Sequence, residues 1–192
     1  RRDYKKAFFL YQKSAKQGYP EGMFKLGECY LYSRGVKENI GKALYWFTQS
    51  ANKGDAQAQR ELAILYEEGK TVEKNEKEAI KYYKKSVAQE DVTAMTYLAF
   101  HYLEGDCGLA KDYSKAIELL NKAKNKGDAE VLGFATKLLA DCYRDGTGVT
   151  QDLHKAFSYY KEVEAKYGGG DLKYELGRCY ELGRGVTKNI NE

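Results

Sequence analysis

The chain has 192 residues, of which 43% are hydrophobic and 31% charged, and its net charge at neutral pH is +4. Acidic and basic residues are interleaved along it, which argues against a nucleic-acid-binding surface, so no nucleic-acid partner is expected. No apolar run is long enough to cross a bilayer and no signal-peptide pattern is present, so direct insertion into a membrane is not expected either.

A Lys-Ala or Glu-Ala pair followed by an apolar, often aromatic run recurs along the chain. The alanines of these pairs are spaced 36, 36, 37 and 40 residues apart. They are Ala7, Ala43, Ala79, Ala116 and Ala156. Self-similarity at such a period predicts a solenoid, in which each structural unit packs on its neighbours.

One unit, at residues 55–90, shows what each repeat contains. Apolar residues at helical spacing predict a first helix that ends at Gly69, since glycine readily adopts the left-handed conformation. After a short polar loop, Ala79, Ile80 and Tyr83 mark a second helix. Each repeat is therefore predicted to be a helical hairpin, with a first helix A and a second helix B.

In chain order, the sequence predicts a half unit, four full units and a final half unit. Their ranges are 1–18, 19–54, 55–90, 91–127, 128–168 and 169–192. The predicted fold is all-α: a single domain forming a right-handed superhelical α-solenoid of antiparallel helix pairs, with about five repeats. The fourth full unit has four more residues between Gly127 and Tyr143 than the first two units have at that place, about one helical turn. This predicts a longer helix A beginning near Ala129, which could change the superhelix locally or form a ledge for a partner.

A second marker returns in every helix A, where Leu-Gly or Leu-Ala comes shortly before a tyrosine. These tyrosines are Tyr30, Tyr66, Tyr102, Tyr143 and Tyr180. The pattern continues through Gly-x-Gly-Val to the next Lys-Ala, and it is clearest over residues 26–55 and 139–160. It resembles the Sel-1-like repeat, a relative of the tetratricopeptide repeat with longer units. Thr71 and Cys107 depart from it by replacing the second loop glycine, and Glu90 replaces the glycine that ends helix B.

Three cysteines occupy one position of the repeat, directly before the tyrosine. Cys29, Cys142 and Cys179 share this position with Leu65 and His101 of the other units. Units along a solenoid are too far apart for these cysteines to form disulfides with one another, so the sequence predicts small buried core residues. This usage weakly favours a reducing, cytoplasmic compartment.

No residue pattern indicates catalysis, a cofactor or a metal. His101 lies in the packing position just described, so a core role is favoured over a catalytic one. His154 lies at the exposed start of a helix B, and no His/Cys group has metal-ligand spacing. Gly168–Gly170 lacks the lysine that follows in a phosphate-binding loop and is better explained as a turn. We therefore expect a protein that is not an enzyme.

The resemblance implies that helix A lines the concave side of the solenoid, as in tetratricopeptide repeats. The predicted partner-binding groove then consists of the helix A residues not used for packing. They are Phe24, Lys25, Glu28, Tyr32, Arg60, Glu61, Ile64, Tyr97, Phe100, Lys137, Asp141, Arg144, Tyr174 and Arg178. The alternative for some of them, above all Phe24 and Tyr97, is packing between units.

The resemblance implies an assembly platform, and the expected function is a non-catalytic scaffold or adaptor. Its partner would be a protein or a peptide held in the groove, with aromatic and arginine side chains as anchors. Two alternatives stay open: an interaction segment of a larger enzyme or signalling protein, and a structural solenoid that self-associates through its repeat ends.

Overall fold

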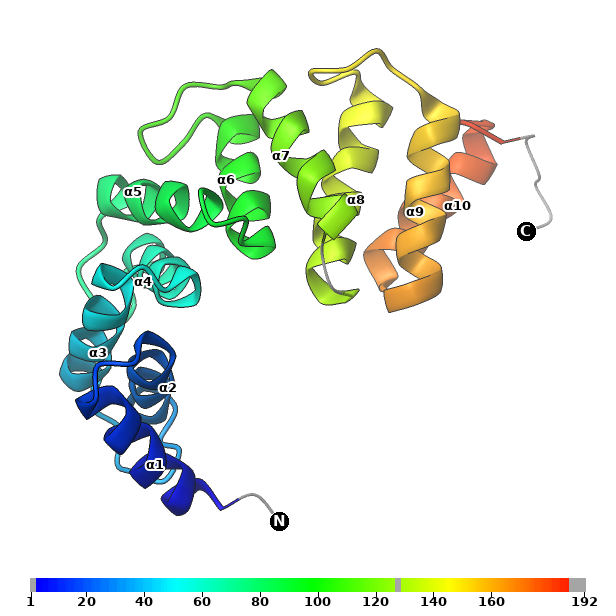
Figure 1. The fold of residues 1–192 in the computed structure, drawn as a ribbon. Helices are drawn as coiled ribbons and strands as arrows, with labels where there is room; N and C mark the ends of the chain where they lie inside the picture. The colour runs from blue at the N-terminus through cyan, green and yellow to red at the C-terminus, as the bar shows by residue number, and fades with distance from the viewer. Residues whose placement is uncertain (1–2, 127–128, 187–192) are drawn as a thin grey trace. The chain divides into compact units, whose positions relative to one another are not determined.

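The computed structural model describes residues 3–126 and 129–186, and this part of the chain contains helices and no strands (Figure 1). The prediction of an all-α repeat fold is confirmed. The first five helices are α1 (Tyr4–Lys16), α2 (Pro20–Leu31), α3 (Ile40–Asn52), α4 (Ala56–Glu68) and α5 (Glu76–Val87). The next five are α6 (Val92–Glu104), α7 (Tyr113–Lys126), α8 (Ala129–Asp145), α9 (Leu153–Tyr167) and α10 (Gly170–Leu182). The even-numbered helices are the A helices of the repeats, and the odd-numbered ones are the B helices.

The chain divides into two compact units, Arg1–Ala94 and Met95–Glu192, which are described separately. In the first unit, each helix from α1 to α5 packs against the next one in sequence. In the second unit, α8 packs against α7 and α9, and α9 packs against α10. Because each contact joins neighbours in sequence, both units have the nearest-neighbour packing that defines helical repeats.

Asp and Asn side chains cap the starts of several helices, although α2 and α10, preceded by Tyr19 and Gly169, have no such cap. Asn39, Asn75 and Asp152 each accept a hydrogen bond from the backbone N–H three residues later, at 2.9 to 3.1 Å. Asp55 does the same for the A helix α4, at 2.7 Å. Such caps satisfy backbone donors that lack a partner inside the helix, so these polar residues fix the point at which each helix begins.

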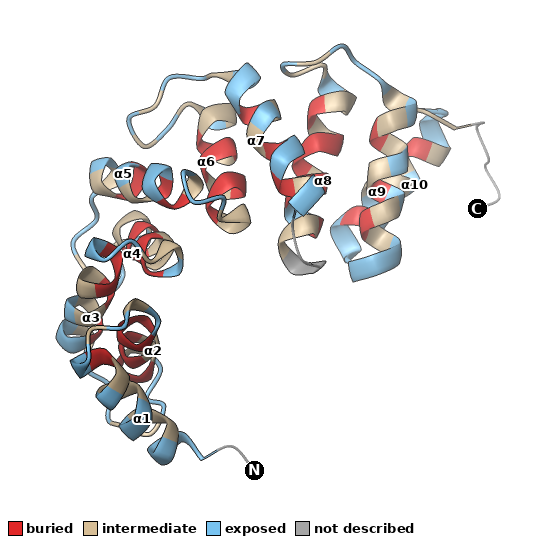
Figure 2. Ribbon diagram, viewed as in Figure 1, coloured by how far each residue is buried: buried red, intermediate tan, exposed pale blue. Residues whose placement is uncertain are grey.

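The helices carry buried residues along part of their length (Figure 2), and in α2, α4, α6 and α8 these include the Leu-small pair. Leu26, Leu62 and Leu139 are fully buried. Gly27 shows why the next residue is small: a Cβ added there would lie only 2.6 Å from the ring of Phe47 on α3. The small residue at this position therefore lets helices α2 and α3 approach closely.

The residues directly before the repeat tyrosines are buried, as predicted. Cys29, Cys142 and Cys179 lie in the core as free thiols, and His101 occupies the same position in its repeat. Burial raises the pKa of the Cys142 thiol to about 11, so it stays protonated at neutral pH. These cysteines therefore act as small apolar core residues.

The longer helix A of the fourth full unit is also confirmed. Helix α8 begins at Ala129 and has 17 residues, compared with 13 in α4 and α6. Over residues 3–126 and 129–186, we find no helix with the length and apolar character needed to span a membrane.

Candidate interaction surface

Helix α8 presents four of its side chains along one face. Phe134, Lys137, Asp141 and Arg144 are spaced three or four residues apart, so they fall on a single stripe of the helix. The last three of them were predicted from sequence as groove residues. All four are at least partly accessible to solvent.

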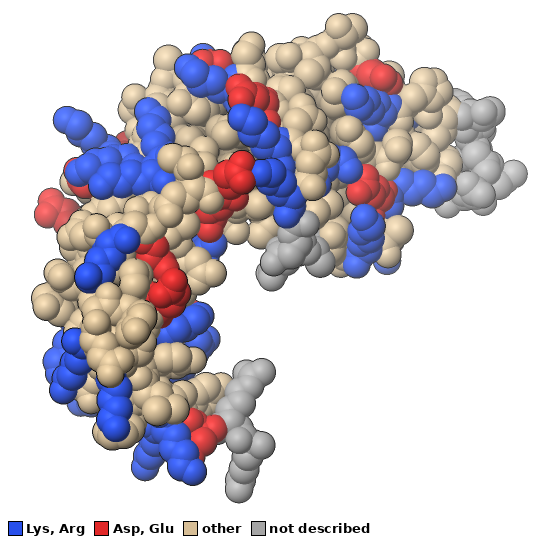
Figure 3. Space-filling view, in the orientation of Figure 1, with Lys and Arg blue, Asp and Glu red and all other residues tan. Residues whose placement is uncertain are grey.

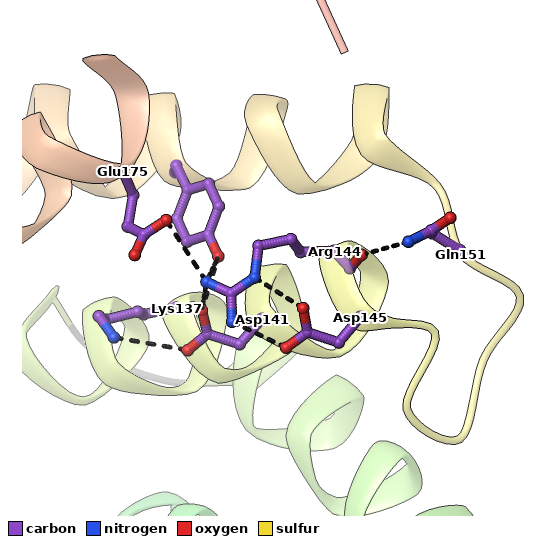
Figure 4. A network of polar contacts seen from close by, with 7 residues as sticks. Lys137, Asp141, Arg144, Asp145, Gln151 and Glu175 are labelled. Atoms are coloured by element: carbon purple, nitrogen blue, oxygen red, sulfur yellow. Dashed lines mark hydrogen bonds and ion pairs between the residues drawn. The ribbon is translucent and has the colours of Figure 1, made fainter. Parts of the chain in front are cut away.

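Arg144 is the centre of a polar network on this stripe (Figure 4). Its guanidinium binds both carboxylate oxygens of Asp145, at 2.8 and 2.7 Å. It also donates to the Tyr160 hydroxyl of α9 at 3.0 Å, and it lies 3.1 Å from Asp141 and 3.5 Å from Glu175 of α10. A single side chain of α8 thus joins two further helices.

The network holds its groups in fixed ionisation states. Burial, followed by a 2.6 Å hydrogen bond to Asp141, raises the pKa of Tyr160 far above neutrality. The hydrogen bonds with Asp145 raise the pKa of Arg144, and they lower the pKa of Asp145. None of these three groups exchanges a proton near neutral pH, so the geometry suits structure and recognition better than acid–base catalysis.

An aromatic cluster lies in the same unit, formed by A helices of successive repeats. The ring of Phe134 on α8 is 6.3 Å from Tyr97 and 6.4 Å from Phe100 of α6, measured between centroids. Tyr97 and Phe100 are half-buried, whereas 41% of Phe134 is exposed. Such contacts between rings stabilise a defined arrangement while leaving apolar area open to solvent. We call Tyr97, Phe100 and Phe134 the aromatic cluster.

Two further predicted residues lie together on α10. Tyr174 is strongly exposed, and the guanidinium of Arg178 lies over its ring, 5.8 Å from the centroid. The pair is one helical turn apart, so both side chains share a face of the helix.

The first unit arranges its predicted residues differently, around acidic groups. Glu28 of α2 pairs with Lys25 at 2.7 Å and lies 3.7 Å from Arg34, whose guanidinium lies over the exposed ring of Tyr32. Burial, followed by the charges of Glu61 and Glu28, raises the pKa of Tyr32. Both signs of charge are interspersed over the face shown in Figure 3.

A cavity of about 320 Å³ adjoins this part of the surface. It lies between α1 and α2 and is lined by Tyr4, Tyr11, Lys25, Glu28 and Arg34, among others. Aromatic rings and charges of both signs therefore surround a space large enough for a partner side chain.

The second A helix of this unit contributes residues that are partly buried. Arg60 forms an ion pair with Asp91 at 2.8 Å, and both side chains are largely withdrawn from solvent. Ile64 is half-buried. Burial raises the pKa of Glu61, and Glu28, Asp91 and Glu68 raise it further against the opposing effect of Arg60. Arg60 is therefore held by its ion pair, whereas Glu61 is partly buried near other carboxylates.

We predict that Glu61→Gln raises the melting temperature at neutral pH. The folded-state pKa of Glu61 is raised, so its charged form destabilises the fold at pH values above that pKa. This cost disappears once the pH falls below the pKa that Glu61 has in the unfolded chain. The melting temperatures of the variant and of wild type should therefore converge in acid. Thermal unfolding of both proteins between pH 7 and pH 4 measures the effect.

Asp145→Asn provides a comparison with the opposite sign. The lowered pKa of Asp145 means that its charged form stabilises the fold at neutral pH, and that this stability is lost as the pH falls through the folded-state pKa. The Asn variant should therefore melt below wild type at pH 7. A Glu61→Gln variant that also melted lower at pH 7 would contradict our description of this site.

The prediction that Phe24 lines the groove is wrong. Phe24 is buried, and its ring lies 5.7 Å from that of Phe47 in the core between α2 and α3. The alternative noted from sequence was packing between units, but the contact of Phe24 with Phe47 lies within one unit, between its helices A and B. Tyr97 is intermediate: it contacts Phe134 and keeps part of its surface accessible.

Sequence reasoning missed three residues that the structure adds to this surface. Phe134 lies just after the extra first turn of α8, at a repeat position that Glu21, Gln57 and Thr93 occupy in the earlier units. Asp145 and Glu175 join the Arg144 network, but no sequence feature marks them, because their role depends on how α8, α9 and α10 meet.

Comparison with known proteins identifies the class to which this architecture belongs. The family model of the Sel1 repeat matches six times, at residues 1–19, 20–55, 56–91, 92–128, 134–162 and 172–192. These matches cover most of the chain, which belongs to the Sel1 repeat family. Sel1 repeats are generally protein-interaction modules, and proteins built from them are typically non-catalytic scaffolds.

Solved structures with the same fold come from several bacteria. A Sel1 repeat protein from Oxalobacter formigenes is 30% identical, with a TM-score of 0.81, and the match covers 97% of this chain and 72% of that one. The protein c5321, a protective antigen of uropathogenic Escherichia coli, is 26% identical with a TM-score of 0.67, over 98% of this chain and 47% of that one. Cysteine-rich protein B of Helicobacter pylori is 25% identical with a TM-score of 0.53, over 68% of this chain and 93% of that one.

A curated relative is the human protein sel-1 homolog 2. It is 34% identical over 81 residues, which is 42% of this chain. The matched segment spans 11% of the length of the human protein.

Proposed function

We propose that this chain is a non-catalytic scaffold or adaptor that holds a peptide or a partner domain against the exposed faces of its A helices. The observation that carries the proposal is the aromatic cluster, in which α6 and α8 present three rings and leave Phe134 substantially exposed. Exposed aromatic side chains that are held in place by neighbours bind at low entropic cost and are common interaction hot spots.

The charged groups next to the cluster support the same function. Lys137, Asp141 and Arg144 continue the stripe that begins with Phe134, and the network of Arg144 keeps them in place. An apolar anchor flanked by fixed charges of both signs suits a segment with one or two apolar side chains and polar flanks, either extended or helical. Side chains that are already held in place favour binding, because they lose little conformational entropy when the partner binds.

A capture experiment with matched variants tests the proposal. The purified chain, immobilised, is exposed to proteins of its own cell in three forms: wild type, Phe134→Ser and Tyr45→Ser. Tyr45 is the control because it is 55% exposed but lies on the B helix α3 of the first unit, outside the aromatic cluster. Proteins retained by wild type and by Tyr45→Ser but lost from Phe134→Ser are the expected result.

Equal retention by all three forms would contradict binding at the aromatic cluster. Circular dichroism of the variants provides the control for folding, since both changes affect exposed side chains and should leave helicity unchanged. A Phe134→Ser variant that lost helicity would show that Phe134 has a packing role instead.

A further inference from the structure

One loop of the second unit brings together three side chains of the kinds that bind metal ions. His101 lies near the end of α6, and Asp106 and Cys107 follow in the loop before α7. One ligand atom from each residue lies within 4.8 Å of the other two, and Nδ1 of His101 is 2.8 Å from Oδ1 of Asp106. Sequence analysis missed this group because His-x4-Asp-Cys is not a common metal-binding motif.

The same three positions are filled differently in the other repeats. The position of His101 is occupied by Cys29, Leu65, Cys142 and Cys179. The position of Asp106 is occupied by Arg34, Lys70, Thr147 and Arg184, and that of Cys107 by Gly35, Thr71, Gly148 and Gly185. No other repeat has a ligating side chain at more than one of these positions. The third full unit thus changes all three together, and its loop also carries an additional residue.

The backbone of Cys107 is in the left-handed region, with φ of +49°. Gly148 and Gly185, at the equivalent place in later repeats, have φ of +71° and +75°. A residue with a Cβ is strained in this conformation, so the loop itself would favour glycine here. A thiol nevertheless occupies the position, beside a buried imidazole and a carboxylate.

We infer that His101, Asp106 and Cys107 form a zinc site, with solvent in the fourth position. Imidazole nitrogen, carboxylate oxygen and thiolate sulfur are the three ligand types of protein zinc sites, and the thiolate favours Zn²⁺ over Mg²⁺ or Ca²⁺. Ligand atoms around tetrahedral zinc lie about 3.4 to 3.6 Å apart, given zinc–ligand bonds of about 2.1 to 2.3 Å. The three atoms here need only small shifts to reach that spacing.

The side chains have the mobility that these shifts require. The Asp106 side chain is 49% exposed and can move away from His101, whereas the His101 ring is fixed by burial. Zinc bound here would join the end of α6 to the loop that leads into α7. A hydrogen bond between His101 and Asp106 alone would also account for the buried ring and does not involve Cys107, so a variant at Cys107 discriminates between the two explanations.

Titration with Co²⁺ and with Zn²⁺, on the reduced and chelator-treated chain, tests the site. We expect wild type to show a thiolate-to-cobalt charge-transfer band in the near ultraviolet, which Zn²⁺ abolishes by displacement. Zinc should also raise the melting temperature by at least about 3 °C. Cys107→Gly should lose both effects, whereas His154→Asn, which changes the chain's other histidine, should retain both.

Cys107→Gly is chosen so that loss of folding cannot explain a loss of metal binding. Glycine suits the left-handed backbone at position 107, so metal-free Cys107→Gly should melt no lower than metal-free wild type. Absence of the band in wild type would overturn the zinc site. A band or a zinc-dependent shift that persisted in Cys107→Gly would overturn it as well, because another cysteine would then be the ligand.

Discussion

Replacing Gly35 with alanine is expected to lower the free energy of unfolding by about 3 kcal/mol. Gly35 follows α2 with φ of +78°, and a Cβ at this position would overlap the backbone carbonyl of Tyr4 on α1. The substitution therefore combines a left-handed conformation with a clash against a backbone that cannot easily move. Urea unfolding followed by circular dichroism measures the loss.

Gly54→Ala separates these two effects. Gly54 also has a positive φ, of +95°, but a Cβ there would meet no atom within 4 Å. Only the conformational cost applies, so we expect a loss of about 1 kcal/mol. Equal losses for the two variants would contradict the close contact between the Gly35 loop and α1.

Arg144→Ala is expected to cost about 2 kcal/mol of stability, because it removes the shared partner of three acidic groups. Asp141, Asp145 and Glu175 would then face one another without the guanidinium, and the buried Tyr160 hydroxyl would lose a donor. The Arg144 side chain is 26% exposed, so solvent replaces part of the lost interaction and the cost stays below that of a fully buried pair.

Arg178→Ala is the matched control for this prediction. Arg178 lies over the exposed ring of Tyr174, so its removal should change stability by no more than about 0.5 kcal/mol. Chemical unfolding of both variants alongside wild type measures the difference. Losses of the same size would mean that the network around Arg144 does not join α8, α9 and α10 as described.

Much of the fold could be predicted because its determinants are local and repeated. The alternation of helices A and B follows from apolar spacing, and Asp or Asn caps fix where several of the helices begin. The buried cysteines could be recognised because aligned repeats share one packing position. The extra turn of α8 could be read from the length of its unit alone.

The parts of the surface that could not be predicted depend on contacts between elements. Phe24 and Lys25 are adjacent in sequence, but the Phe24 ring packs on Phe47 of α3, whereas Lys25 pairs with Glu28 and stays partly accessible to solvent. Only the packed position of α3 distinguishes them. Glu175 reaches Arg144 because α9 sets the distance between α8 and α10, and no spacing within either helix encodes that distance.

The loop after α6 shows that a chemical site, too, can depend on contacts that the sequence does not reveal. His101 was assigned to the core by its repeat position, and it is buried there. That assignment does not exclude a second role, because the left-handed turn at Cys107 brings Asp106 and Cys107 back to the imidazole. Sequence spacing alone does not reveal this return of the chain.

The most direct test of the proposed function is the dissociation constant of the complex between this chain and the segment captured from the cell, measured by isothermal titration calorimetry. If the aromatic cluster is the anchor, Phe134→Ser should raise the dissociation constant at least about tenfold, while Tyr45→Ser should leave it within about twofold of wild type. A Phe134→Ser variant that bound as tightly as wild type would contradict a partner-binding surface on the A helices of the second unit.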